Sequence, residues 1–388
     1  MYIPRDMRGE LLTLTGEYPI VTLLGPRQAG KTTLALKSLP DYTYSNLEDP
    51  EVREFAEEDP KGYLKQFPGK TILDEIQRVP TLLSYLQVEV DAHPENGRFV
   101  LTGSHQLSLR EAVTQSLAGR TAILTLLPLS VHELKKAGIQ HPNFSNYCFT
   151  GFLPRVYEQS QRPFRAYGNY YQTYVERDVR QLIHLKDQSL FEKMLKLVAG
   201  RVGQLMDYSA LSNDVGVDSK TIRHWLSILE ASFILMKLPP YFENYGKRVI
   251  KSPKYYFTET GLLCYLLGIR EPEQVLRDPL VGNIFENLVV TEALKTCLNA
   301  GDPADLYFFR DSKGNEVDLL SGSGQNLLAV EIKSASTFSK DQVKGLRRFR
   351  ELSQTCAKAA LIYTGENYDF SDGISARHFS EIHSVLTR

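Results

Sequence analysis

The residues best suited to chemistry lie near the start of the chain, in a stretch that combines glycines, a lysine and threonines. Residues 25–32, GPRQAGKT, have the spacing GxxxxGK[ST] and follow the apolar run PIVTLL at residues 19–24. Such glycines let backbone N–H groups curl around phosphates, while the lysine reaches the β and γ phosphates and the hydroxyl helps to hold Mg²⁺. We therefore predict an ATP-phosphate loop formed by Gly25, Pro26, Arg27, Gln28, Ala29, Gly30, Lys31, Thr32 and Thr33.

Two adjacent carboxylates follow a second apolar run. The run KTILDEIQ, residues 70–77, is a predicted strand that ends in Asp74 and Glu75. A carboxylate in this position holds Mg²⁺ through water, so Asp74 and Thr32 are the predicted metal-binding residues. Glu75 is the predicted catalytic carboxylate, placed to orient and polarise the water that attacks the γ phosphate. The alternative is a strand end with two solvated acids.

Three further polar side chains are candidates for sensing the γ phosphate. The run RFVLTGS, residues 98–104, ends in Thr102 and Ser104, either of which can lie between the carboxylates and the phosphate. An ordinary strand-to-turn Gly-Ser is the alternative. Arg120 is a candidate for sensing phosphate in its own pocket or for entering a neighbour's pocket as an arginine finger, and a surface arginine is an equal alternative.

The spacing of apolar runs predicts the scaffold that positions these residues. Predicted strands at residues 19–24, 42–46, 70–74, 98–103 and 121–127 alternate with helical stretches. This alternation predicts a parallel sheet covered by helices on both faces, with the ligand at the carboxyl ends of the strands. We assign residues 1–140 to this α/β P-loop domain.

Six motifs follow one another in an order that resembles the AAA+ ATPases related to archaeal ATPases: GPRQAGKTT, YSNLEDPEVR, LDEIQRVP, LTGSHQLSL, SLAGR and LPLSVHEL. The resemblance extends to GFLPRVYE at residues 151–158 and YVERDV at residues 174–179. Such ATPases commonly carry a C-terminal domain of unknown function. The resemblance implies an ATP- and Mg²⁺-dependent AAA+ domain of the ASCE class that hydrolyses ATP. It also implies a homo-oligomer, and the oligomer that AAA+ proteins usually form is a hexamer.

The middle of the chain is predicted to be helical and then to form a winged helix-turn-helix. Residues 141–203 are assigned to a helical lid or linker and residues 204–279 to the winged-helix-like domain. Its second helix would expose Lys220, Arg223 and His224, the predicted DNA-binding residues, and bury Ile222, Leu226 and Leu229. A basic stretch in or near the wing supplies Lys247, Arg248, Lys251 and Lys254. Winged helices also mediate protein contacts, so a structural or protein-binding role is the alternative.

The last segment, residues 280–388, has predicted elements in the order helix, three strands, helix, strand, which resembles the core of the PD-(D/E)xK nuclease superfamily. The resemblance implies a restriction-endonuclease-like α/β domain whose motif residues are Glu286, Asp318, Glu331 and Lys333. Asp318 and Glu331 would coordinate Mg²⁺ or Mn²⁺, and Lys333 would position or deprotonate the attacking water. Val317 stands where the motif has proline. The alternative is a domain that keeps the fold for binding or scaffolding.

Composition limits the classes of partner. The 388 residues carry a net charge of −1, so DNA contacts must come from local patches such as the basic stretch near the wing or Arg347, Arg348 and Arg350. Four widely spaced cysteines predict buried thiols rather than a zinc site or disulfides. No apolar run approaches the roughly 18–20 residues of a membrane helix and the start resembles no signal peptide, so we expect a cytoplasmic protein with no membrane partner.

These features support two hypotheses of different classes. In the first, an AAA+ ATPase couples hydrolysis to DNA engagement and cuts nucleic acid with its last domain. In the second, the chain is an ATP-gated DNA- or protein-binding module with an inactive nuclease-like domain. A small-molecule kinase is disfavoured because Glu75 after Asp74 suits water activation.

Overall fold

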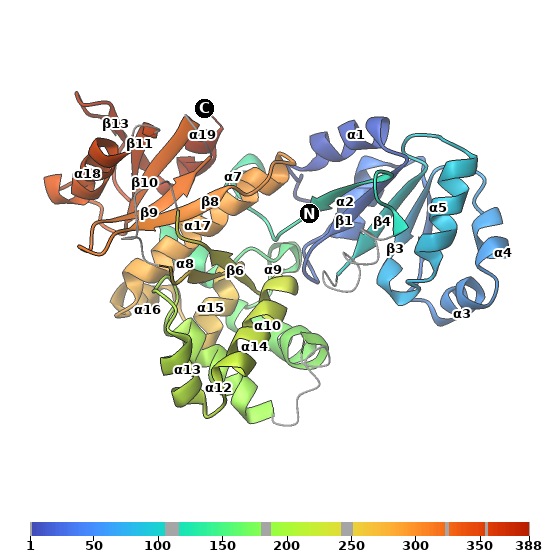
Figure 1. Cartoon of the computed structure of the whole chain (residues 1–388), viewed down its shortest axis with the longest axis horizontal. Helices are drawn as coiled ribbons and strands as arrows, with labels where there is room; N and C mark the ends of the chain where they lie inside the picture. Colours follow the sequence, from blue (N-terminus) through green and yellow to red (C-terminus); the bar gives the residue numbers. More distant parts are fainter. Residues whose placement is uncertain are drawn as a thin grey trace. The chain divides into compact units, whose positions relative to one another are not determined.

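The computed structural model describes residues 2–104, 116–179, 188–241, 251–322, 326–353 and 356–387, shown in Figure 1. The chain divides into two compact units. The first unit comprises Met1–Leu129 with the short segments Ala231–Phe233 and Leu298–Asp302. The second comprises Ser130–Glu230, Ile234–Cys297 and Pro303–Arg388, so the segments assigned to the linker, the winged helix and the nuclease-like domain share one unit.

A five-stranded parallel sheet forms the centre of the first unit. Its strand order is β2-β3-β4-β1-β5, and every neighbouring pair is parallel. Strands β1 and β4 are buried along their whole length, as expected for apolar runs covered on both faces. Each strand lies within a predicted range, which confirms the parallel sheet: β1 (Ile20–Leu24), β2 (Thr43–Asn46), β3 (Thr71–Asp74), β4 (Phe99–Gly103) and β5 (Thr121–Thr125).

Helices of the first unit pack on this sheet and connect its strands. Leu11 and Leu34, from the first two helices, pack in one apolar core with Val21, Ile72 and Val100 of the sheet. The predicted helix at residues 107–117 lies largely outside the described residues. The described elements are α1 (Arg8–Glu17), α2 (Lys31–Ser38), α3 (Pro50–Glu58), α4 (Pro60–Lys65), η1 (Ile76–Arg78) and α5 (Leu82–Ala92).

The second unit begins with helices. They are α7 (Val131–Lys136), α8 (Phe144–Thr150), α9 (Pro154–Glu158), α10 (Pro163–Tyr170), η2 (Tyr171–Val179), α12 (Gln188–Ala199), α13 (Tyr208–Val215), α14 (Ser219–Ala231), α15 (Thr260–Leu266), α16 (Pro272–Arg277) and α17 (Val281–Asn299). Gly216, with a left-handed φ of 95°, ends α13, and the Asp218 carboxylate accepts a hydrogen bond from the N–H of Thr221 at the start of α14. An antiparallel pair, β6 (Leu235–Leu238) and β7 (Lys254–Phe257), follows.

A mixed sheet of order β12-β13-β11-β10-β9-β8 ends the second unit. Strands β8, β9 and β10 are antiparallel neighbours, whereas β10 and β11 run parallel. Every element predicted after residue 280 is present. The elements are β8 (Leu306–Arg310), β9 (Glu316–Ser321), β10 (Leu327–Lys333), η4 (Lys340–Val343), α18 (Lys344–Leu352), β11 (Cys356–Tyr363), β12 (Tyr368–Asp369), β13 (Ile374–His378), η5 (Phe379–Glu381) and α19 (Ile382–Leu386).

The structure also tests the expectations for cysteines and membranes. All four cysteines are free thiols; Cys148 and Cys264 are buried as predicted, whereas Cys297 and Cys356 are partly exposed. None of the helices in the described part of the chain is long and apolar enough to cross a membrane.

Candidate functional site

The predicted phosphate loop joins the end of β1 to the start of α2. A Cβ atom on Gly25 would lie 2.0 Å from the carbonyl oxygen of Leu126, so only glycine fits there. Gln28 and Gly30 adopt left-handed backbone, with φ of 64° and 91°. Left-handed residues in such a loop turn successive N–H groups toward one point, where an anion can bind, and the helix N-terminus adds a positive dipole.

Lys31 is the first residue of α2 and is 5% exposed. Its ammonium donates hydrogen bonds to the carbonyl oxygens of Gly25, at 3.0 Å, and Pro26, at 2.9 Å. Burial lowers the pKa of Lys31 to about 8, although the carboxylates of Glu75 and Asp74 oppose this. The ammonium is thus held over the loop, where phosphate oxygens would compensate its buried charge.

Asp74 accepts hydrogen bonds from three hydroxyl groups on three elements. Thr32 Oγ1 lies 2.9 and 3.1 Å from its two carboxylate oxygens, Tyr44 OH lies 2.8 Å away, and Thr102 Oγ1 also donates to it. Both predicted Mg²⁺-binding residues are therefore in contact, and an all-oxygen pair fits this hard cation. Tyr44 was not predicted. The pairing of β2 with β3 places it on the face of Asn46, the partner of Asp74 in the sheet.

Glu75 adopts left-handed backbone, with φ of 58° and ψ of 46°. Its N–H donates to Thr102 Oγ1 at 3.2 Å, and its carboxylate accepts from Ser104 Oγ at 3.0 Å and from the Gln77 amide. Gln77, which was not predicted, also donates to Ser104 Oγ at 3.1 Å. Both candidate sensor hydroxyls thus contact the acid pair, Thr102 through Asp74 and Ser104 through Glu75.

A third residue missed by sequence reasoning, Arg5, binds the backbone of the phosphate loop. Its guanidinium donates to the carbonyl oxygens of Ala29 and Leu127, each at 2.6 Å, and Arg5 is 6% exposed. It therefore ties the loop to the segment that follows β5. Two other loop residues lie at the surface: Arg27 is 3.9 Å from the carboxylate of Glu48, and Thr33 is exposed on α2.

Arg120 lies at the opposite edge of the sheet from the phosphate loop. Its carbonyl accepts from the N–H of Ile20, the first residue of β1, whereas the loop follows the last residue of that strand. Its guanidinium binds Asp91 through two hydrogen bonds of 2.6 and 2.8 Å. A five-residue strand spans about 16 Å. The prediction that Arg120 senses phosphate in its own pocket is therefore wrong, while a role in a neighbour's pocket stays a prediction.

The four residues predicted to form a nuclease motif converge in the second unit. Lys333 Nζ lies 2.7 Å from Glu331 Oε1 and 3.1 Å from Asp318 Oδ2. Glu286, on α17, is bound by Lys254 and not by Lys333. Burial raises the pKa of Glu331 to about 8, the nearby charge of Asp318 adds to the effect, and Lys333 opposes it.

The prediction that Lys254 belongs to a basic surface near the wing is wrong, because this lysine is buried. It is 3% exposed, and its ammonium lies 2.9 Å from Glu286 Oε1 and 2.7 Å from Glu316 Oε1. Burial opposes its charge, but the carboxylates of Glu286, Asp318 and Glu316 outweigh burial and raise the pKa of Lys254. Lys254 is therefore not available to DNA. Of the same stretch, Lys251 is exposed, and residues 247 and 248 lie outside the described part of the chain.

The cluster of Glu286, Asp318, Glu331 and Lys333 in the second unit does not fit a metal ion in this arrangement. Among the described residues, no group of three or more His, Cys, Asp or Glu side chains is placed to hold one. The ammonium of Lys333 also bridges Asp318 and Glu331, the two predicted ligands. Coordination of a cation there would require this ion pair to open.

The predicted DNA-binding residues lie on the exposed side of α14. Lys220, Arg223 and His224 are exposed, and Ile222, Leu226 and Leu229 are buried as predicted. The Arg223 guanidinium stacks over the ring of Tyr208 at 3.7 Å. The second basic patch is partly neutralised, because Arg347 and Arg348 pair with Asp372 and Glu351.

Comparison with known proteins identifies the first unit. Residues 17–135 match the family model of an AAA domain, residues 109–273 that of a domain of unknown function (DUF8612), and residues 281–382 that of another (DUF4143). The parallel sheet, the phosphate loop and this match make the first unit an AAA domain of the P-loop ATPase type. The two other matches leave the winged-helix and nuclease-like interpretations as predictions.

Relatives match along nearly the whole chain. The uncharacterized proteins Rv2008c of Mycobacterium tuberculosis and Mb2031c of Mycobacterium bovis are each 31% identical over 377 residues, covering 96% of this chain and 82% of theirs. The uncharacterized protein MJECL04 of Methanocaldococcus jannaschii is 23% identical over 391 residues, covering 85% and 86%. Among solved structures, the Walker-type ATPase PABY2304 of Pyrococcus abyssi has 14% identity and a TM-score of 0.46, covering 67% of this chain and 94% of its own.

Proposed function

The chain belongs to the family of the mycobacterial proteins Rv2008c and Mb2031c, and from its AAA domain we propose that it binds ATP with Mg²⁺ and hydrolyses it. The observation that carries this proposal is that the hydroxyl group of Thr32 contacts the carboxylate of Asp74. The adjacent carboxylate, Glu75, accepts a hydrogen bond from Ser104. Hydroxyl and carboxylate oxygens suit the metal, and a second carboxylate bound by a neutral hydroxyl keeps its capacity to accept a proton.

Each residue of this site has a role that follows from its contacts. Lys31 would bind the β and γ phosphates, and Thr32 and Asp74 would hold Mg²⁺, which neutralises charge on the phosphate oxygens. Thr102 fixes the backbone of Glu75, and Ser104 orients its carboxylate. Glu75 would then polarise the water that attacks the γ phosphate.

Substitution of Lys31 tests nucleotide binding. Lys31→Ala removes the ammonium from the loop and should weaken ATP binding at least about tenfold, or about 1.4 kcal/mol, in equilibrium titrations. The matched control is Lys37→Ala, which removes an exposed lysine from the same helix. Equal ATP affinity in the two variants would contradict the assignment of the loop.

Proposed engagement of DNA rests on the second unit. Helices α13 and α14 are joined by a short turn and followed by the β6–β7 pair, which is the element order of a winged helix, and α14 exposes three residues that suit phosphate contacts. Replacing Lys220 and Arg223 by alanine should weaken DNA binding and reduce its salt dependence. Unchanged binding at low salt would assign the domain to protein contacts instead.

The last segment supports a nuclease-like fold more than nuclease activity. Its strands β8 to β11, with α17 before them and α18 between β10 and β11, have the order of the PD-(D/E)xK core. Because Lys333 already neutralises Asp318 and Glu331, we favour an ATP-gated module that binds DNA or a protein. Mg²⁺- or Mn²⁺-dependent cutting of DNA that Asp318→Ala abolishes would overturn this preference and establish the nuclease.

A further inference from the structure

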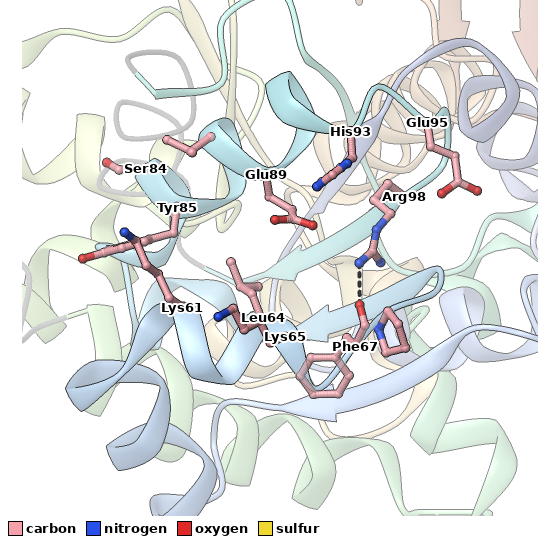
Figure 2. A pocket seen from close by; sticks show the side chains of 12 residues that line it. Lys61, Leu64, Lys65, Phe67, Ser84, Tyr85, Glu89, His93, Glu95 and Arg98 are labelled. Carbon is pink, nitrogen blue, oxygen red and sulfur yellow. Dashed lines mark hydrogen bonds between the residues drawn. The ribbon is translucent and has the colours of Figure 1, made fainter.

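A cavity of about 830 Å³ lies in the first unit between α4 and α5, as Figure 2 shows. Its lining includes Phe67 and Pro68, which precede β3, and Arg98, which precedes β4. These positions are at the amino ends of the parallel strands, whereas the phosphate loop follows the carboxyl end of β1. The cavity is therefore distinct from the nucleotide site, and its volume is within the range of small-molecule sites, about 300–1,000 Å³.

Much of the lining is apolar. Leu64, Phe67 and Pro68 come from α4 and the turn after it, and Tyr85 and Val88 come from α5. Val88 is 65% exposed, although it lies on a helix whose other valine, Val90, is buried. Covering such a surface with the apolar body of a ligand is favourable, at about 25 cal/mol per Å² of apolar area removed from water.

The charge that a ligand would meet is dominated by Arg98. Arg98 is 5% exposed, and its guanidinium donates to the carbonyl oxygens of Phe67 and Gly69, which leaves other N–H donors of its five for a ligand. It forms no ion pair with any residue in the described part of the chain. The carboxylates in the lining are more exposed: Glu89 is half-buried and Glu95 is exposed.

Because water and salt screen exposed charges more than buried ones, the field of Arg98 outweighs those of the two carboxylates. Lys61 and Lys65, both exposed on α4, add positive charge at the rim. We propose that this cavity is a binding site for a small organic anion that has an aromatic or branched aliphatic body and places its anionic group at Arg98. The site is independent of ATP hydrolysis.

The probe for this site is 8-anilinonaphthalene-1-sulfonate, an aromatic anion whose emission rises in apolar surroundings. It is titrated into the full chain with saturating Mg²⁺-ADP, so that the nucleotide site is filled. Ser84→Trp fills the cavity from an exposed position on α5, and Ala92→Trp is the matched control, since Ala92 is exposed on the same helix and does not line the cavity. We expect saturable binding that Ser84→Trp weakens at least about tenfold and Ala92→Trp leaves within about twofold.

The neutral analogue N-phenyl-1-naphthylamine, which lacks the sulfonate, tests the anionic class. It should bind at least about tenfold more weakly than the sulfonate to the unmodified chain. Equal binding of the two dyes would overturn the proposal in favour of an apolar groove for protein side chains. Absence of saturable sulfonate binding, or equal affinities in the two tryptophan variants, would overturn the site itself.

Discussion

The substitution Thr102→Val tests whether the hydroxyl group of Thr102, on β4, contributes to catalysis beyond its contribution to stability. Valine has nearly the shape of threonine, so the substitution removes the hydroxyl without opening a cavity. Thr102 Oγ1 donates to Asp74 and accepts from the N–H of Glu75. That second bond stabilises Glu75 in left-handed backbone, which costs a non-glycine residue roughly 1–2 kcal/mol.

The structure gives the magnitude of the effect. An N–H left without a partner costs about 1–3 kcal/mol, and the lower end applies here because Glu75 is only half-buried. Asp74 keeps its hydrogen bonds from Thr32 and Tyr44, so loss of the hydrogen bond from Thr102 destabilises it less than it would destabilise a carboxylate with no other partner. We expect the free energy of unfolding to fall by about 1–2 kcal/mol, as measured by urea denaturation.

Activity should fall more than this loss of stability would suggest. With Glu75 released from its backbone geometry, part of the ~10²–10⁴-fold contribution of a positioned base is lost, so kcat should drop at least about tenfold. KM for ATP should change little, because the phosphate loop keeps its contacts. The matched control is Thr22→Val, which removes a buried hydroxyl on β1 that bonds Thr121 at 3.0 Å. A Thr102→Val enzyme with the kcat of Thr22→Val would refute the reasoning.

Three further predictions concern the charged groups of the two units. Glu75→Gln should keep ATP binding and lose at least about 100-fold in turnover, whereas Glu57→Gln, at an exposed position on α3, should change neither. Burial lowers the pKa of Lys31 to about 8, whereas a free lysine has a pKa near 10.4, so unfolding of the nucleotide-free protein takes up a proton between these two pH values. The free energy of unfolding that this residue contributes therefore rises with pH across this window. Lys31→Met should flatten the dependence of the free energy of unfolding on pH, as measured by denaturation. Lys254→Met leaves buried carboxylates uncompensated and should destabilise the chain by about 3–5 kcal/mol, whereas Lys251→Met at the surface should change stability by less than about 0.5 kcal/mol.

Local patterns predicted the elements that carry the site. The apolar runs and the spacing of the glycine loop placed all five strands of the first sheet, because buried parallel strands are continuous apolar segments. They also placed Lys31, after the loop that follows β1, and Asp74 and Glu75, at the end of β3, at the same edge of the sheet. In the second unit, the apolar runs predicted the element order, whereas Asp318 and Glu331 were singled out by the resemblance to the PD-(D/E)xK core.

Contacts between distant segments were beyond these patterns. The bond from Tyr44 to Asp74 depends on the order of strands in the sheet, which the sequence does not state. Arg120, by contrast, could have been placed from the sequence, because it directly precedes the predicted strand at residues 121–127 and therefore lies at the amino end of a parallel strand, away from the ligand. Lys254 resembled a surface cation because a buried lysine is rare, and only the fold reveals the carboxylate of Glu286 that compensates it.

The two acid pairs of the chain differ in what surrounds them, and this difference separates their chemistry. Neutral hydroxyl groups donate to Asp74 and Glu75, so the negative charge of the pair is oriented but not cancelled. An ammonium lies against both Asp318 and Glu331, so that pair is already neutralised in part. A divalent cation gains most where carboxylate charge is uncompensated. The same two residue types therefore suit Mg²⁺ in the AAA domain and an internal ion-pair network in the last segment.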